Sequence, residues 1–342
     1  MGKVIGVLTA GGDCPGLNAV IRGVVTRSVE VNDAEVVGIL NGWEGLMDGA
    51  TRNLDRESVR GILTRGGTVL GTSRRDPYVH GEGYESCRRT IERNGIEALV
   101  VIGGDGTLAS ALRLSQEGLP VVGVPKTIDN DIAGTDVTFG FDTAVQIASD
   151  AIDRLATTAE AHNRVIVCEV MGRTKGWIAT YAGMAGGADA ILIPEVPYDL
   201  DEIAKVIRSR HRRGRSFSIV VTAEGIQPPE GWDMDVKTDA FGFARLGGVG
   251  YAIAAELERR TGFETRVSVL GHIQRGGTPT AFDRVLASRL GVAAADMAAA
   301  GDTGVMVGVR GTEIVSVPLE IAGSGARSVD DAIYDAARTF FG

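Results

Sequence analysis

Two aspartate-containing motifs follow apolar runs of the chain and could handle phosphate. GGDGT occupies residues 103–107, after the run that ends at Ile102, and PKTIDND occupies residues 125–131, after the run 120–124. Glycines let backbone N–H groups approach phosphate oxygens, and the N-terminus of a following helix favours the phosphate charge. Carboxylates near phosphates hold Mg²⁺ or take a proton from an attacking hydroxyl. Asp105 alone suits Mg²⁺, whereas Asp129 and Asp131 suit either task or simple capping of a turn.

Two more glycine-rich turns strengthen the case for a phosphate ligand. They are TAGGDCPGLN, residues 9–18, and TRGGTVLGTSR, residues 64–74, and each is expected to follow an apolar strand as GGDGT does. No turn matches GxGxxG or GxxxxGK[ST], so neither a dinucleotide-binding fold nor a Walker-type NTPase is indicated. The alternative is that the glycines serve only the turns.

A set of polar side chains near other strands suggests a sugar phosphate. Arg forks bind phosphate bidentately, and carboxylates pair with sugar hydroxyls. We expect these residues at the carboxyl ends of predicted strands, where ligands bind in open α/β sheets. Taken singly, each is better explained as a solvated charge or an ion-pair partner, and only together do they suggest a sugar-phosphate pocket. The set consists of Arg164, Arg173, Glu224, Arg266, His272 and Arg275.

Apolar periodicity predicts elements that could hold these loops. Strands are predicted at 4–9, 35–40, 98–102, 120–124, 164–171, 190–193, 217–222, 266–270 and 305–309. Helices are predicted at 17–31, 83–93, 107–116, 143–158, 200–213, 250–260, 281–300 and 329–340. Strands alternating with helices predict an α/β fold with largely parallel sheets. The polar segment 226–247 is expected to be a surface excursion.

Composition narrows the class of protein. A chain of 342 residues favours two domains, and its net charge of −9 argues against nucleic acid as a partner. No apolar run approaches the roughly 20 residues that span a bilayer, and no signal peptide is apparent, so we expect no membrane association. The three cysteines, Cys14, Cys87 and Cys168, form no CxxC pair. A cytoplasmic enzyme is the expectation, with Cys14 either a small turn residue or a reactive thiol.

GGDGT, PKTIDND, MGR (171–173), AEG (223–225) and LGHIQRGGTPTAFDR (270–284) stand in this order along the chain. In this order and spacing they resemble the bacterial-type 6-phosphofructokinases, in particular the branch that contains both ATP- and pyrophosphate-using enzymes. The resemblance covers essentially the whole chain. It implies two Rossmann-like three-layer domains with the active site in the cleft between them. Residues 1–140 plus 275–325 would form the phosphate-donor domain, and 141–274 plus 326–342 the fructose 6-phosphate domain.

The resemblance also implies roles for individual residues. Asp129 would be the general base that takes the proton of the 1-hydroxyl of fructose 6-phosphate, and Asp105 would hold Mg²⁺. Thr127 and Asp131 would flank the transferring phosphoryl group, and Arg173 would stabilise its developing charge. The donor site would comprise Gly11, Arg74, Arg75, Gly103, Gly104, Asp105, Gly106, Thr107 and Lys126.

The fructose 6-phosphate site implied by the resemblance draws on two subunits. Arg164 and Arg266 match residues that reach across from a neighbour, so a homotetramer is implied, with a homodimer as the alternative. The remaining acceptor residues would be Thr127, Asp129, Met171, Gly172, Arg173, Glu224, His272 and Arg275.

The identity of the donor depends on Gly106 and Lys126. Pyrophosphate-using relatives typically carry an aspartate where Gly106 stands, and its side chain would intrude on the α-phosphate of ATP. Lys126 is common in pyrophosphate-using members. The sequence favours ATP, because steric exclusion at a tight backbone site is hard to evade.

Two other classes of protein, another kinase family and a non-catalytic nucleotide-binding protein, fit the sequence less well, and one basic surface run has two possible roles. Lipid and NAD kinases also carry GGDGT, but they are not expected to carry PKTIDND with GHIQRGG. A non-catalytic nucleotide-binding protein is disfavoured because Asp129 and Arg173 are both present. The basic run RSRHRRGR, residues 208–215, is either a phosphate-effector site or a solvated helix end.

Overall fold

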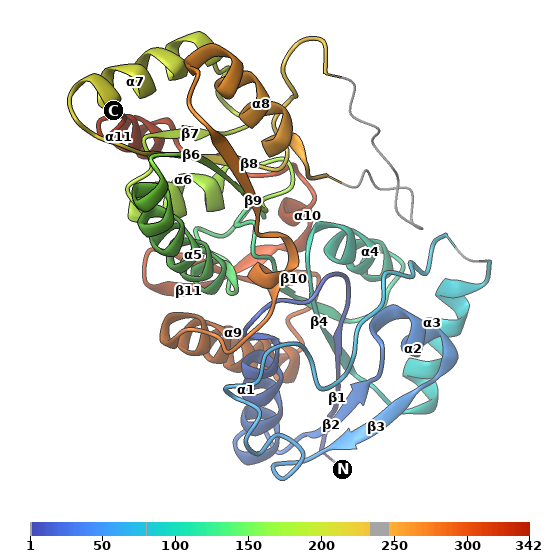
Figure 1. Ribbon diagram of the computed structural model, residues 1–342. Helices are drawn as coiled ribbons and strands as arrows, with labels where there is room; N and C mark the ends of the chain where they lie inside the picture. The colour runs from blue at the N-terminus through green and yellow to red at the C-terminus, as the bar shows by residue number, and fades with distance from the viewer. Residues whose placement is uncertain (1, 80, 233–245) are drawn as a thin grey trace. The chain divides into compact units, whose positions relative to one another are not determined.

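The computed structural model describes residues 2–79, 81–232 and 246–342 of the chain. The chain gathers into two compact units (Figure 1). The first comprises Met1–Ile128, Ile132–Thr143 and Arg275–Ala326, and the second comprises Asp129–Asp131, Ala144–Gln274 and Arg327–Gly342. Each unit is built around a sheet of its own.

The first unit contains a seven-stranded sheet in the order β11-β10-β5-β4-β1-β2-β3. Its inner strands are parallel, and β3 and β11 pair antiparallel at the two edges. β4 and β5 are buried throughout, as expected of parallel strands covered on both faces. The strands are β1 (Val4–Thr9), β2 (Glu35–Ile39), β3 (Thr51–Leu54), β4 (Ala98–Gly103), β5 (Val121–Pro125), β10 (Val305–Arg310) and β11 (Glu313–Pro318).

Two helices of the first unit cross closely at paired glycines. A Cβ added at Gly23 of α1 would lie 2.8 Å from the carbonyl oxygen of Ser288, and one at Gly291 of α9 would lie 2.4 Å from that of Val20. Any larger side chain would force the helices apart, since cores are packed without spare volume. The helices of this unit are α1 (Leu17–Glu30), α2 (Gly42–Asp48), α3 (Gly83–Arg93), α4 (Asp105–Gln116), α9 (Ala281–Ala300) and α10 (Leu319–Ala322).

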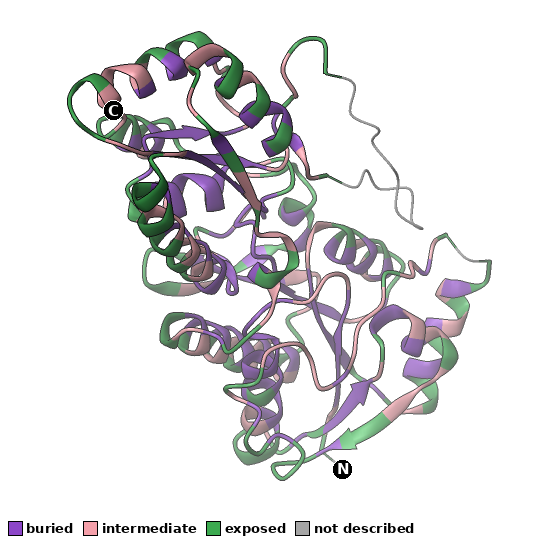
Figure 2. Cartoon of the chain, in the orientation of Figure 1, coloured by how far each residue is buried: buried purple, intermediate pink, exposed green. Residues whose placement is uncertain are grey.

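The second unit contains a parallel four-stranded sheet in the order β7-β8-β6-β9. Its strands are largely buried, whereas its helices present an exposed side to solvent (Figure 2). The strands are β6 (Val165–Val170), β7 (Ala190–Leu192), β8 (Ser218–Ala223) and β9 (Thr265–Val269). The helices are α6 (Trp177–Ala185), α7 (Leu200–Arg212), α8 (Val249–Thr261), α11 (Asp331–Arg338), most of α5 (Phe141–His162), and most of the 3₁₀ turn η1 (Gly271–Arg275), whose last residue belongs to the first unit.

The predicted α/β class with mostly parallel sheets is confirmed, and every predicted strand and helix has a counterpart. The sequence missed β3 and β11, and also α2, α6 and the single-turn α10. One expectation about the loops was wrong: loop 64–74 does not directly follow a strand. The preceding strand, β3, already ends at Leu54. Most of the segment 226–247 lies outside the described residues. Among the helices that the structure describes, none is long and apolar enough to cross a membrane.

A buried carboxylate fastens the start of α9 to the start of α5. Asp283 is fully buried, and its Oδ2 accepts a hydrogen bond from the backbone N–H of Thr143 at 2.8 Å and another from the Thr143 hydroxyl. Thr280, the N-cap of α9, donates from its own N–H to the Thr143 hydroxyl at 3.0 Å. Burial raises the pKa of Asp283 to about 6, against the hydrogen bonds from Thr143 that lower it.

This raised pKa predicts a pH dependence of stability. The folded state keeps the Asp283 proton up to higher pH than the unfolded chain does, so protonation of Asp283 stabilises the folded state. This contribution to the free energy of unfolding is fully present below pH 4 and is lost as the pH rises through 6. A shift from 3.8 to about 6 corresponds to roughly 3 kcal/mol. Asp283→Asn cannot ionise, so its free energy of unfolding relative to the wild type should rise between pH 4 and pH 7.5. The measurement is urea unfolding at both pH values, with the exposed Asp302→Asn as the control. A wild-type-to-variant difference that does not change with pH would contradict the assignment.

Candidate active site

Three neighbouring strands of the first unit bring the candidate donor residues to one edge of its sheet. β1 pairs with β4 up to Thr9 and Ile102, and β4 pairs with β5 up to Gly103 and Pro125. The loops that follow therefore emerge side by side, at the carboxyl ends where ligands bind in such sheets. These loops carry Gly11, Gly104 to Thr107, Lys126 and Thr127.

The irregular loop 64–74 reaches this edge through hydrogen bonds rather than through a strand of its own. The backbone N–H of Gly11 donates to the carbonyl oxygen of Ser73 at 2.9 Å, and the Thr72 hydroxyl donates to that of Gly11 at 2.6 Å. Arg74, which follows, is exposed, whereas Arg75 is half-buried and lies 3.4 Å from a carboxylate oxygen of Glu44. The loop thus lies against the β1 turn at Thr72 and Ser73, directly before the two arginines.

Lys126 places a buried positive charge at the same turn. The residue is only 4% exposed, and its Nζ donates to the carbonyl oxygen of Gly12. A Cβ added at Gly11, where φ is +81°, would come within 3.2 Å of the Thr107 hydroxyl and 3.8 Å of Nζ. The glycine therefore keeps the backbone, the ammonium and the hydroxyl close together, an arrangement suited to an anion.

α4 begins at Asp105, so Asp105 and Gly106 form its first turn. A Cβ added at Gly106 would meet no atom of the described residues within 4 Å, and the residue is exposed. Asp105 is half-buried, and the described residues contain no cluster of three or more His, Cys, Asp or Glu that could hold a metal. A single carboxylate fits Mg²⁺, which in phosphate sites draws its other ligands from phosphate oxygens and water.

The second predicted motif forms a buried turn directly after β5. Thr127 is held by the Thr138 hydroxyl, which donates to its carbonyl oxygen at 2.8 Å. Asp129, Asn130 and Asp131 are 6%, 3% and 4% exposed. Asn130 has a φ of +54°, a left-handed conformation that asparagine adopts more readily than most residues. The two aspartates thus lie on a tight turn with little access to solvent.

The loops after β6, β8 and β9 meet at the matching edge of the second unit's sheet. β6 pairs with β8 up to Val170 and Ala223, and with β9 up to Glu169 and Val269. Met171, the first residue after β6, donates its backbone N–H to Oε1 of Gln274 at 2.9 Å. The sequence therefore predicted correctly that Arg173, Glu224 and His272 follow the ends of strands.

The backbone of Arg173 adopts a left-handed conformation that its neighbours hold in place. Its φ is +54°, and its N–H donates to Oε1 of Glu224 at 3.0 Å. A Cβ added at Gly225 would lie 1.8 Å from the carbonyl oxygen of Arg173, so only glycine fits there. Glu224 and Gly225, both from the AEG motif, thus fix the turn that presents the exposed guanidinium.

Sequence reasoning missed Glu169, a buried carboxylate beneath these loops. The residue is 1% exposed and accepts hydrogen bonds from the N–H groups of Gly248, at 2.8 Å, and Gly250, at 2.7 Å. It therefore caps the N-terminus of α8, where a negative charge is favoured. Glu169 lies inside the apolar run VIVCEV of β6, so the sequence gave no signal beyond a single charge in a buried strand.

Arg164 and Arg266 do not lie at carboxyl ends, so that expectation was wrong. Arg164 precedes β6, and Arg266 pairs with Ile166 near the amino ends of β9 and β6. Four residues separate Ile166 from Val170, or about 13 Å at roughly 3.3 Å per residue. Both guanidiniums instead contact Glu264, with Nη2 of Arg164 at 2.9 Å from Oε1.

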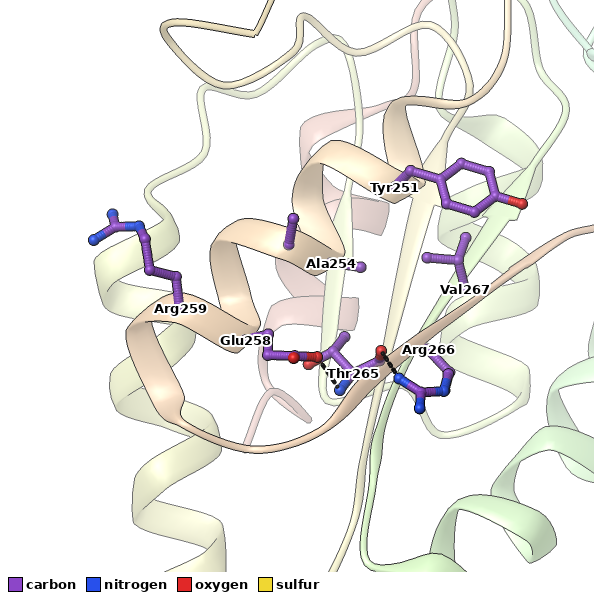
Figure 3. Close-up of a pocket in the computed structure, with 8 residues that line it drawn as sticks. Tyr251, Ala254, Glu258, Arg259, Thr265, Arg266 and Val267 are labelled. Carbon is purple, nitrogen blue, oxygen red and sulfur yellow. Dashed lines mark hydrogen bonds between the residues drawn. The ribbon is translucent and has the colours of Figure 1, made fainter.

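Arg266 also lines a pocket of about 530 Å³ at the open edge of the second unit's sheet, between α8 and β9 (Figure 3). Glu258 accepts a hydrogen bond from the backbone of Thr265 there at 2.8 Å. The pocket is lined by Tyr251, Ala254, Ala255, Glu258, Arg259, Thr265, Arg266 and Val267.

The structure places Arg275 beside the β1 turn of the first unit. Its Nη1 donates to the carbonyl oxygen of Asp13 at 3.2 Å, and a Cβ added at Gly12 would lie 3.0 Å from that nitrogen. His272, in the same 3₁₀ turn, is exposed. Cys14 is fully buried and burial raises its pKa to about 12, so it is a small turn residue and not a reactive thiolate.

The basic run 208–215 is largely committed to internal contacts. Nη1 of Arg208 donates to the carbonyl oxygen of Arg260 at 2.8 Å, and Nη1 of Arg210 lies 2.9 Å from Oδ1 of the buried Asp189. Nη2 of Arg213 donates to the carbonyl oxygen of Gly342 at 2.7 Å. These contacts indicate that the run holds α7 in place, and they disfavour the alternative that it is a phosphate-effector site.

Comparison with known proteins fits this geometry. The model of the phosphofructokinase family matches residues 4–298. The pyrophosphate–fructose 6-phosphate 1-phosphotransferase of Streptomyces coelicolor is 53% identical over 342 residues, covering 99% of both chains. ATP-dependent 6-phosphofructokinase 2 of the same organism is 54% identical over 340 residues, covering 98% of this chain and 99% of that one. The names of these relatives thus divide between two phosphate donors.

A solved structure agrees as well. The phosphofructokinase of Pichia pastoris superposes with a TM-score of 0.84 at 33% identity, covering 95% of this chain and 36% of that one. The chain therefore spans nearly the whole length of its curated relatives, but only about a third of the Pichia chain. The resemblance drawn from GGDGT, PKTIDND and GHIQRGG is confirmed, and the chain belongs to the phosphofructokinase family.

Proposed function

We propose that the chain transfers a phosphoryl group from ATP to the 1-hydroxyl of fructose 6-phosphate, with Mg²⁺. The observation that carries this proposal is the buried turn Asp129–Asp131, which follows Thr127 at the end of β5. Asp129 takes the proton of the attacking hydroxyl. Thr127 and Asp131 orient the transferring group, and Arg173 stabilises the charge that develops on it. Positioning and electrostatics of this kind dominate phosphoryl transfer.

The two units divide the work in this proposal. The first unit binds the donor through the loops after β1, β4 and β5, together with Arg74 of loop 64–74 and the adjoining Arg75. The second unit binds fructose 6-phosphate through Met171, Gly172, Glu224 and His272, with Arg275 added from the first. Mg²⁺ held by Asp105 would neutralise charge on the donor phosphates.

Gly106 supports ATP as the donor. A Cβ added there would meet no described atom within 4 Å, so the first turn of α4 is open at the position proposed to face the donor. Lys126 favours pyrophosphate, the second candidate, because it concentrates positive charge at the Gly11–Gly12 turn. Its ammonium already bonds the carbonyl oxygen of Gly12, so it serves the turn itself and is compatible with either donor.

Initial rates test the donor directly. Fructose 6-phosphate and Mg²⁺ are supplied with ATP or with pyrophosphate in separate reactions, and formation of fructose 1,6-bisphosphate is measured. Turnover with ATP and none with pyrophosphate supports the proposal. Turnover with pyrophosphate alone would replace ATP by the second candidate, and no turnover with either donor would overturn the proposed function.

We also propose that the chain acts as a homo-oligomer, usually a tetramer in this family, with Arg164 and Arg266 serving the site of a neighbouring subunit. Their positions at the amino ends of β6 and β9 support this, since the loops of their own sheet lie beyond the reach of an arginine side chain.

Mixing two inactive variants tests this sharing. Arg266→Ala and Asp129→Ser should each be nearly inactive at low fructose 6-phosphate. In a mixed pair the site with Asp129 intact receives Arg266 from its neighbour, so random mixing in a symmetric pair should restore about a quarter of wild-type activity. Co-refolding the two variants and assaying the product gives the result. No recovery in verified mixed oligomers would place Arg266 in its own subunit's site.

A further inference from the structure

Arg327 contacts the catalytic turn although no sequence motif singles it out. Its backbone N–H donates to the carbonyl oxygen of Asp131 at 2.6 Å, and its Nη2 donates to that of Asn130 at 3.1 Å. Both carbonyls belong to the buried turn that carries Asp129. A buried carbonyl left unsatisfied costs about 1–3 kcal/mol, and a guanidinium donor strengthens the bond. One residue therefore satisfies two consecutive carbonyls of the turn.

The same residue is fixed on its other side by Trp177, the first residue of α6. The Trp177 indole N–H donates to the carbonyl oxygen of Arg327 at 2.9 Å, and the guanidinium carbon lies 4.2 Å from the centroid of the indole ring. Trp177 is 1% exposed. The interaction between a guanidinium and the aromatic ring on which it stacks contributes about 0.5–2 kcal/mol of stability. A planar guanidinium also loses little rotational freedom when it makes hydrogen bonds.

A shared carboxylate and a lysine secure the two segments around this contact. Glu195 accepts from the backbone N–H of Gly176, at 3.0 Å, and from that of Val329, at 3.2 Å. Nζ of Lys175 donates to the Ser328 hydroxyl at 2.8 Å. Hydrogen bonds, some of them through Glu195, thus hold residues 175–177 next to residues 327–329. Arg173 lies two residues before Lys175, so the turn of Asp129 and the loop of Arg173 are both tied to one segment.

We infer that Arg327, stacked on Trp177, is a positioning residue of the second unit. It holds the Asp129–Asp131 turn at a fixed position relative to the loop that carries Arg173. This inference rests on the proposed function. Arg327 donates to two backbone carbonyls of the turn, so in this inference it acts on the reaction through the placement of Asp129. A displacement of about 1 Å at a catalytic group can cost on the order of 10²-fold in rate.

Kinetics of Arg327→Met and Arg327→Lys test the inference. Methionine keeps the bulk and loses the donors, so kcat should fall about 10- to 100-fold. The KM for fructose 6-phosphate should stay within about threefold, because the residues proposed to bind the sugar phosphate are unchanged. Lysine should recover part of kcat through one charged donor. The matched control is Arg338→Met on α11, whose guanidinium is exposed and lies 3.8 Å from Asp335, and its kcat should equal that of the wild type.

Hydrogen–deuterium exchange supplies a readout that does not need turnover. Peptides covering residues 126–133 should exchange faster in Arg327→Met than in the wild type, while peptides from β6 should not change. An unchanged kcat in an active Arg327→Met enzyme would overturn the inference, as would a rise in KM that accounts for the whole loss. A wild type inactive with both donors would overturn the proposed function and the catalytic part of this inference, and exchange would then decide alone whether Arg327 holds the turn.

Discussion

Asp129→Asn is expected to lower kcat by about 10²- to 10⁴-fold, the usual contribution of a positioned general base. Asparagine has nearly the same shape as aspartate, so it keeps the packing of a residue that is only 6% exposed. It cannot accept the proton of the sugar hydroxyl. The residues proposed to bind the phosphate and sugar are untouched, so fructose 6-phosphate should still bind. Steady-state kinetics with calorimetric titration of fructose 6-phosphate separates the two effects.

Asp136→Asn is the matched control for this loss. Asp136 stands five residues beyond Asp131, and its Oδ1 lies 3.0 Å from Nη1 of Arg310 in a half-exposed ion pair. Exposed pairs of this kind are worth about 0.2–1 kcal/mol of stability. Its turnover should therefore match the wild type. Near-normal turnover in Asp129→Asn, with the Asp136 variant behaving as expected, would remove Asp129 from the role of base.

The sequence predicted the strands that matter most for the site, because these strands are buried. β4 and β5 read as short apolar runs ended by glycine or proline, and the loops after them carry GGDGT and PKTIDND. β3 escaped because its residues TRNL are mostly polar and lie at the edge of the sheet. α6 escaped because WIATYAGMA is apolar nearly all round, so no amphipathic period marks it.

The features that the sequence could not give are contacts made through the backbone. Arg327 lies in GARSVDD, a segment without a motif, and its two contacts with the turn are to carbonyl oxygens that every residue type possesses. Loop 64–74 likewise reaches Gly11 through backbone and hydroxyl hydrogen bonds rather than through a preceding strand. Arg266 was misplaced for a different reason: the predicted strand 266–270 begins at Arg266, so the residue belongs at the amino end of that strand, opposite the carboxyl end where ligands bind.

Gly106→Asp is expected to change the choice of donor. An added Cβ meets no described atom within 4 Å, and an acidic residue in the first turn of α4 is favoured by the helix dipole, so the fold should tolerate the change. Under the proposed function the new carboxylate would repel and crowd the α-phosphate of ATP. Like charges brought together cost several kcal/mol, so kcat/KM for ATP should fall by about 10²-fold. Any use of pyrophosphate, which is smaller, should change far less.

Gly106→Asn and Gly106→Ala separate charge from bulk in this effect. Asparagine adds nearly the same volume as aspartate without the charge, and alanine adds a single methyl group. If repulsion dominates, kcat/KM for ATP should fall most in the aspartate variant. If steric exclusion dominates, asparagine should be nearly as harmful as aspartate. Measuring all three variants with both donors decides the matter. An equal loss of ATP and pyrophosphate turnover in Gly106→Asp would mean that the change disturbs Asp105 or the start of α4 rather than the space for the donor, and the argument for ATP from Gly106 would then fail.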